Sequence, residues 1–178
     1  MSQHFSGKRI DAYWWLFFLL GLWLFVCAAF LYRLQPSGIA RLAIFFQIAI
    51  LLSFVLDTVT GTFRNNASGG NLSFVAAMFD LSLAALLFVK PVEIVFYFPI
   101  IASTWLLFRN IAALGRTLFI HTRSLSLRIL IFVKCFAGVG IAFMALMQTD
   151  LEDRSFPVWM ALASLTLGLH NLLLAFNP

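Results

Sequence analysis

The stretch LSFVAAMFDLSLAALLFV, residues 72–89, decides the fold, because it is long and apolar enough to cross a membrane yet carries Asp80 at its middle. An ionised carboxylate at the centre of a membrane helix costs roughly 2.5 to 3.5 kcal/mol on insertion scales. Such a residue normally faces protein, not lipid. The stretch therefore predicts a bundle of membrane helices that buries Asp80.

The composition agrees with this prediction. The chain has 178 residues, of which 62% are hydrophobic and 11% are charged, and its mean hydropathy is +0.98. Soluble domains carry about 25% charged residues. Six spans of about 20 residues would occupy roughly two thirds of the chain. We therefore expect a single transmembrane domain over residues 1–178, with no soluble domain beside it.

Apolar segments and polar connections alternate along the chain. The expected spans begin near residues 13, 41, 72, 92, 127 and 157, and they form three helical hairpins over about 13–66, 71–122 and 126–177. The first segment follows Lys8 and Arg9, as a signal peptide would, but its apolar run is too long and no A-x-A-like cleavage site follows it. The sequence thus predicts an all-α polytopic protein with six transmembrane helices.

The basic residues predict the orientation. With six spans both termini lie on one side, which would hold seven basic residues: Lys8, Arg9, Arg64, Arg109, Arg116, Arg123 and Arg128. The other side would hold four: Arg33, Arg41, Lys90 and Arg154. By the positive-inside rule, both termini are expected in the cytoplasm.

A spacing repeats at the ends of the second, fourth and sixth spans. Asp57-Thr58 precedes Arg64, Arg109-Asn110 precedes Arg116, and His170-Asn171 precedes Asn177, each time by seven residues. An ionisable residue and a small polar one thus lie two helical turns before a polar terminus. Chance placement of polar residues near span ends is the alternative, but three copies of one hairpin explain the spacing better.

With these features the chain resembles the HdeD family of bacterial inner-membrane acid-resistance proteins. The resemblance runs from the Trp14-Trp15 pair to Phe176, and Thr58 stands where glycine is common in the family. The matching features are the tryptophan start, Gly21, Pro36, Asp57, Pro91 and the ending from Arg109 to Arg116. The resemblance implies three two-helix repeats, the bacterial inner membrane and a link to acid or envelope stress. It supplies no catalytic residue.

Polar residues inside the spans are the candidate site. They are Asp57, Asp80, Arg109, Asn110, Lys134, His170 and Asn171. Depths estimated along each helix place the charged ones in the same half of the bilayer, where two acids and two bases balance. We expect Asp80 to pair with Lys134, and Asp57 with Arg109, as devices that fix which helices touch. The alternative is a proton or solute path that includes His170, since histidine changes charge between about pH 5 and 8.

Other classes of function find less support in the sequence. His170 is expected to be a hydrogen-bonded histidine between helices, and Gly138 and Gly140 are expected to allow close helix approach. Cys27 and Cys135 lie in apolar runs, where thiols behave as small hydrophobes, and no metal-ligand spacing or cofactor motif occurs. Catalytic motifs are missing, so we expect no enzyme. The expected partners are the lipid bilayer and a second copy or another membrane protein, but not nucleic acid.

Overall fold

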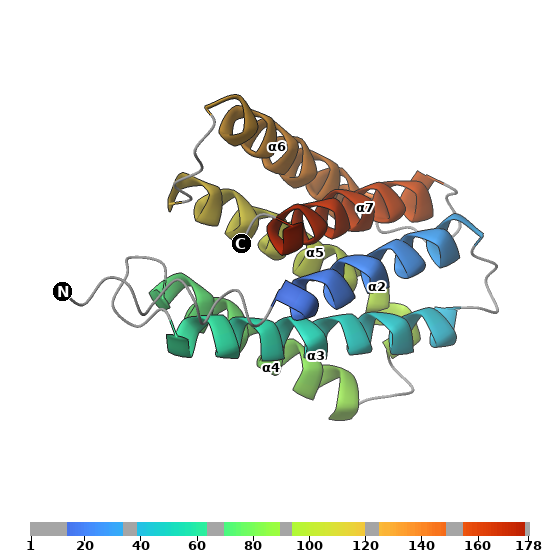
Figure 1. The fold of residues 1–178 in the computed structure, drawn as a ribbon. Helices are drawn as coiled ribbons and strands as arrows, with labels where there is room; N and C mark the ends of the chain where they lie inside the picture. Colours follow the sequence, from blue (N-terminus) through green and yellow to red (C-terminus); the bar gives the residue numbers. More distant parts are fainter. Residues whose placement is uncertain are drawn as a thin grey trace.

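The protein is an all-α bundle in the computed structural model, which describes residues 14–33, 39–63, 70–89, 94–119, 125–148 and 155–176. These residues form six helices (Figure 1). The helices are α2 (Trp14–Tyr32), α3 (Ile39–Phe63), α4 (Gly70–Val89), α5 (Ile94–Phe119), α6 (Leu125–Met147) and α7 (Ser155–Phe176). The prediction of an all-α chain is confirmed, and six helices form within the described residues.

The ends of the helices follow the polar residues of the sequence to within a few positions. Pro157 lies in the first turn of α7, where a missing N–H is tolerated. Pro99, by contrast, lies inside α5, which continues through it. Several polar parts of the chain lie outside the described residues. They are the N-terminal tail, the turn at 36–38, the reversal at 90–91, His121 and Arg123 of the basic connection, and the acidic residues 150–153.

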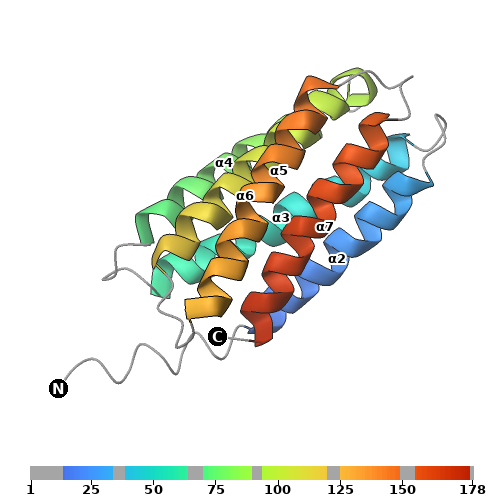
Figure 2. The ribbon, with the colours of Figure 1, turned by 90° about the horizontal axis from the view of Figure 1, so that it is seen from above.

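Each helix packs on the next one along the chain and α2 packs on α7, so the contacts among the six helices close a ring. Figure 2 shows α2 and α7 side by side. The most extensive packing joins α2 to α7, α3 to α4, and α5 to α6. In addition, α5 contacts both α3 and α7 across the ring. α5 therefore contacts more of the other helices than any other helix does.

The contact between α2 and α7 is made backbone against backbone at two glycines. A Cβ atom at Gly21 would lie 3.0 Å from the carbonyl oxygen of Gly168, and one at Gly168 would lie 3.0 Å from the carbonyl oxygen of Gly21. Ala28, Ala161 and Ala175 are also small and buried, and their seven-residue spacing from Gly21 or Gly168 places them on the same helix faces as these glycines. Small residues let helices approach closely enough for their backbones to touch, which explains why the first and last helices pack so extensively.

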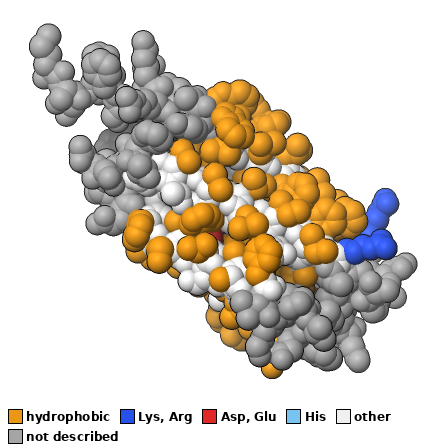
Figure 3. Space-filling view, turned by 90° about the horizontal axis from the view of Figure 1, so that it is seen from below, with side chains coloured by type: hydrophobic (Ala, Val, Ile, Leu, Met, Phe, Trp, Pro, Cys, Tyr) orange, Lys and Arg blue, Asp and Glu red, His pale blue; other side chains and the backbone are white. Residues whose placement is uncertain are grey.

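Large apolar side chains cover the outside of the bundle, as Figure 3 shows for one face. They are exposed on every helix, and include Leu22, Ile44, Phe74, Tyr97, Phe136 and Leu169. Five helices are long and apolar enough to cross a membrane, and the searched part of α4, Ser73–Phe88, is shorter. The buried interior, by contrast, holds two aspartates and an arginine.

Candidate functional site: buried polar clusters

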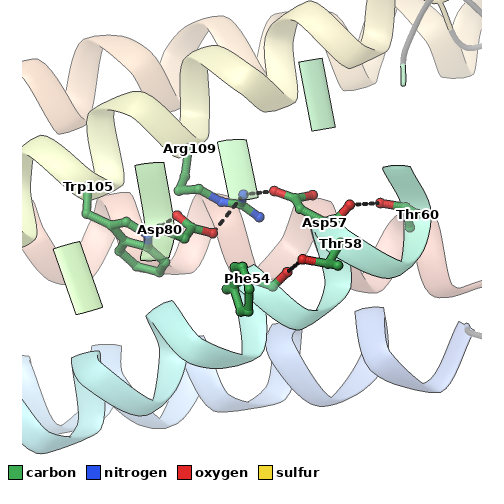
Figure 4. Close-up of polar contacts among 7 residues, drawn as sticks. All are labelled: Phe54, Asp57, Thr58, Thr60, Asp80, Trp105 and Arg109. Atoms are coloured by element: carbon green, nitrogen blue, oxygen red, sulfur yellow. Dashed lines mark hydrogen bonds and ion pairs between the residues drawn. The ribbon is translucent and has the colours of Figure 1, made fainter. Parts of the chain in front are cut away.

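One buried charge cluster joins three helices that all contact one another, α3, α4 and α5 (Figure 4). Arg109 of α5 donates through Nη1 to Oδ2 of Asp57 on α3, and the same Nη1 lies 3.3 Å from Oδ2 of Asp80 on α4. The aspartates are 0% exposed and the arginine is 3% exposed. A guanidinium is suited to this role because it presents several donors in a fixed plane.

Trp105 completes the cluster from the same helix as the arginine. Its indole Nε1 donates to Oδ1 of Asp80 at 2.9 Å, so this carboxylate accepts from two donors of α5. The two donors are four residues apart and therefore share one face of the helix. The indole also packs edge-on against Phe46 of α3, with ring centroids 6.0 Å apart. Sequence reasoning missed Trp105, although its four-residue spacing from Arg109 places both side chains on one face of the helix.

The predicted pair of Asp57 with Arg109 is confirmed, but the predicted pair of Asp80 with Lys134 is wrong. Asp80 bonds to α5 instead, as described above. Lys134 belongs to α6, which packs mainly on α5 and α7, and its Nζ has no hydrogen-bond partner among the described residues. The correction has a simple cause: α5 lies beside both aspartate helices, so Arg109 reaches both carboxylates.

A second polar cluster lies between α6 and α7. Sγ of Cys135 and Nδ1 of His170 are 3.5 Å apart, and both residues are buried. The expectation of an interhelical polar contact for His170 is therefore confirmed. Its thiol partner was missed, because a cysteine in an apolar run had been read as a small hydrophobe. Asn171 is also buried, and its Nδ2 donates back to the carbonyl oxygen of Leu167 at 3.0 Å.

Asn110 and Gly138 connect this second cluster to α5. Nδ2 of Asn110 donates to the carbonyl oxygen of Leu106 at 2.8 Å, which fixes the amide against its own helix. A Cβ at Gly138 would lie 2.3 Å from Oδ1 of Asn110 and 3.1 Å from Oγ1 of Thr166 on α7. The missing side chain at Gly138 thus makes room for two polar groups. Gly140 is different: it is exposed, with nothing within 4 Å of its Cβ position, so the expected close approach there is wrong.

The chemistry available to these clusters is that of charge pairing and hydrogen bonding. Within the described residues, no group of three or more His, Cys, Asp or Glu side chains is placed to hold a metal ion. The contact of Cys135 with His170 joins a thiol to a base, but both side chains are buried between α6 and α7. Nucleophilic catalysis needs a substrate that can reach the thiol. The geometry is better suited to holding helices together.

Comparisons with protein-family models, with curated proteins and with solved structures find no match.

Proposed function

We propose that this chain is a multi-pass membrane protein that works without catalysis. The distribution of side chains supports the proposal: large apolar residues face outward on every helix, while Asp57, Asp80 and Arg109 are buried together. Water-soluble bundles normally place ionised groups at the surface and apolar groups inside. A hydrocarbon solvent favours the arrangement seen here, because charged groups must find partners within the protein. Five helices also have the length and apolarity for a membrane span.

Within this class, we propose a protein of the HdeD type in the bacterial inner membrane, built of three hairpin repeats with both termini in the cytoplasm. It would support acid or envelope stress tolerance by contacts with the membrane, with a second copy or with another membrane protein. The observation that carries the proposal is the cluster of Arg109 with two aspartates, which ties α3, α4 and α5 together. A cluster of this kind fixes helix arrangement, and it requires no substrate.

Two measurements test these proposals separately. Single cysteines introduced at positions 64, 123 and 152 are labelled from each side of the membrane in intact cells, in a background that lacks Cys27 and Cys135. Periplasmic labelling at 64 or 123, or cytoplasmic labelling at 152, would refute the topology. Survival of cells after acid exposure is then compared with and without the chain. Equal survival, with the protein present and correctly inserted, would refute the stress role but leave the topology standing.

Proton-linked transport is a second candidate function. It is favoured by the ionisable groups buried between helices, namely Asp57, Asp80, Arg109, Lys134 and His170, since intramembrane charges often mark ion pathways. The test is proton or solute flux into proteoliposomes that contain the purified chain. Flux that Asp80→Asn abolishes and that Gly140→Ala leaves unchanged would establish transport. Absence of flux in the wild type would exclude proton transport and transport of each solute assayed.

A further inference from the structure

The charge cluster of α3, α4 and α5 is not electrically balanced when all of its groups are ionised. Asp57 and Asp80 then carry two negative charges, whereas Arg109 carries one positive charge. The three side chains are at most 3% exposed, so water does not screen the excess. A buried charge without compensation is strongly unfavourable. The cluster therefore needs a further positive charge.

The surrounding helices do not supply this charge from their described side chains. Their buried or half-buried titratable groups are Cys27 on α2, Lys134 and Cys135 on α6, and His170 on α7. The only cation among them at neutral pH, Lys134, forms no ion pair with the described residues, and its Nζ has no hydrogen-bond partner there. His170 contacts Cys135. Asp80 is thus faced by Asp57 from α3 and by Arg109 from α5.

Both carboxylates end at the same atom of the arginine. Asp57 and Asp80 each place Oδ2 against Nη1 of Arg109, and Figure 4 shows them on opposite sides of the guanidinium. Two carboxylates that share one buried site do not both ionise, because their charges repel. Oδ2 of Asp80 lies 3.3 Å from Nη1, whereas bonds between charged groups are about 2.7 to 2.9 Å long. Asp80 is therefore the better carrier of a proton.

A second buried polar group lies beside Asp80. Ser53 precedes Asp57 by one helical turn, shares its face of α3 and is 0% exposed. Its hydroxyl lies next to the carboxyl of Asp80, although Oγ makes no regular hydrogen bond within the described residues. A neutral carboxylic acid needs a donor for one oxygen and an acceptor for its O–H. Trp105 already donates to Oδ1, and Ser53 can accept from Oδ2.

We propose that the cluster is a proton-binding site, in which Asp80 is a neutral carboxylic acid while Asp57 and Arg109 form the ion pair. One bound proton on Oδ2 of Asp80 removes the excess charge. A metal cation is a poorer occupant, because the guanidinium already lies between the two carboxylates and would repel it. The inference goes beyond the proposed function, since it concerns a proton that the bundle holds and not one that crosses a membrane.

Infrared spectroscopy of the purified full chain tests the proposal, because the C=O stretch of a protonated carboxylic acid is separate from the bands of carboxylates and amides. The chain is measured in a maltoside detergent, which has no carbonyl group of its own. At pH 7, acids in water are ionised. The wild type should nevertheless show a carboxylic-acid band, with the area of one carboxyl per chain, that shifts when the side-chain carboxyl of aspartate is labelled with ¹³C.

Three variants assign the band. Asp80→Asn should remove it together with the acid, and Asp57→Asn should remove it because a single carboxylate then balances Arg109. Asp150→Asn, outside the described residues, is the matched control and should keep it. Circular dichroism verifies that each variant is helical.

A folded wild type without the band at pH 7 would overturn the proposal. Persistence of the band in Asp80→Asn would assign it to another acid, and its loss in Asp150→Asn would assign it to Asp150. Persistence in Asp57→Asn would show that the shared guanidinium is not the cause of protonation. Each of these results would also overturn the proposal. None of them bears on membrane insertion or acid survival, so failure of this inference and failure of the proposed function are distinguishable.

Discussion

Gly138→Ala should destabilise the bundle, although alanine is the better helix former. The new Cβ would lie 2.3 Å from Oδ1 of Asn110, so that oxygen must move by about 1 Å to restore ordinary contact. Overpacking of this kind costs about 1 to 3 kcal/mol. Loss of the hydrogen bond from Asn110 to Leu106 costs about 0.5 to 1.5 kcal/mol, and the helix gains about 0.5 to 1 kcal/mol from replacing glycine. The free energy of unfolding should fall by about 2 kcal/mol.

Gly140→Ala is the control, because it makes the same chemical change two residues away on the exposed side of α6. It should stabilise the protein by about 0.5 to 1 kcal/mol. Reversible unfolding in mixed detergent micelles measures both variants. The pair Gly138→Ala with Asn110→Ala should recover part of the loss, since the obstructing oxygen is gone. If Gly138→Ala and Gly140→Ala have the same free energy of unfolding, the packing described between Asn110 of α5 and Gly138 of α6 is refuted.

Three further outcomes follow from the contacts described. Arg109→Leu should cost about 3 to 5 kcal/mol in an unfolding titration, because it leaves two carboxylates buried beside an apolar group, and Arg109→Lys should recover only part of the loss. In a double-mutant cycle, Asp80→Leu and Lys134→Leu should be additive within about 0.5 kcal/mol, and larger coupling would show that the two side chains do meet. Gly168→Ala should lower Tm by forcing α2 away from α7, and an unchanged Tm would contradict the backbone contact there.

Much of the fold is predictable from hydropathy and charge alone. Segments of about 20 apolar residues have few ways to satisfy their backbone groups except as helices. Polar connections mark where those helices end, which explains why the expected and observed bounds agree closely. The burial of Asp80 and Arg109 also follows from the sequence, because ionised groups avoid lipid.

The partners of the buried charges are harder to predict, because depth along a helix says nothing about direction around it. Lys134 and Arg109 lie in the same half of the predicted bilayer, so depth alone allows Asp80 to pair with either. The choice depends on which helices are neighbours, and α5 reaches both aspartates while α6 packs elsewhere. The contact of His170 with the thiol of Cys135 was missed for the same reason: it depends on α6 and α7 being neighbours, which cannot be predicted from the sequence of either helix alone.

The closure of the ring by α2 and α7 sets the order in which the protein can be assembled. The partners of α3 and α5 follow them directly in the chain, so these pairs form as soon as the next helix is made. α2 must wait for the last helix to be synthesised, which takes on the order of ten seconds at cellular translation rates. In a membrane the face of α2 that later meets α7 would be exposed to lipid in the meantime, although α3 covers another part of the helix. No aspartate, glutamate, lysine, arginine or histidine occurs in Trp14–Tyr32, so the helix that stays longest without its partner is one that hydrocarbon accommodates at little cost.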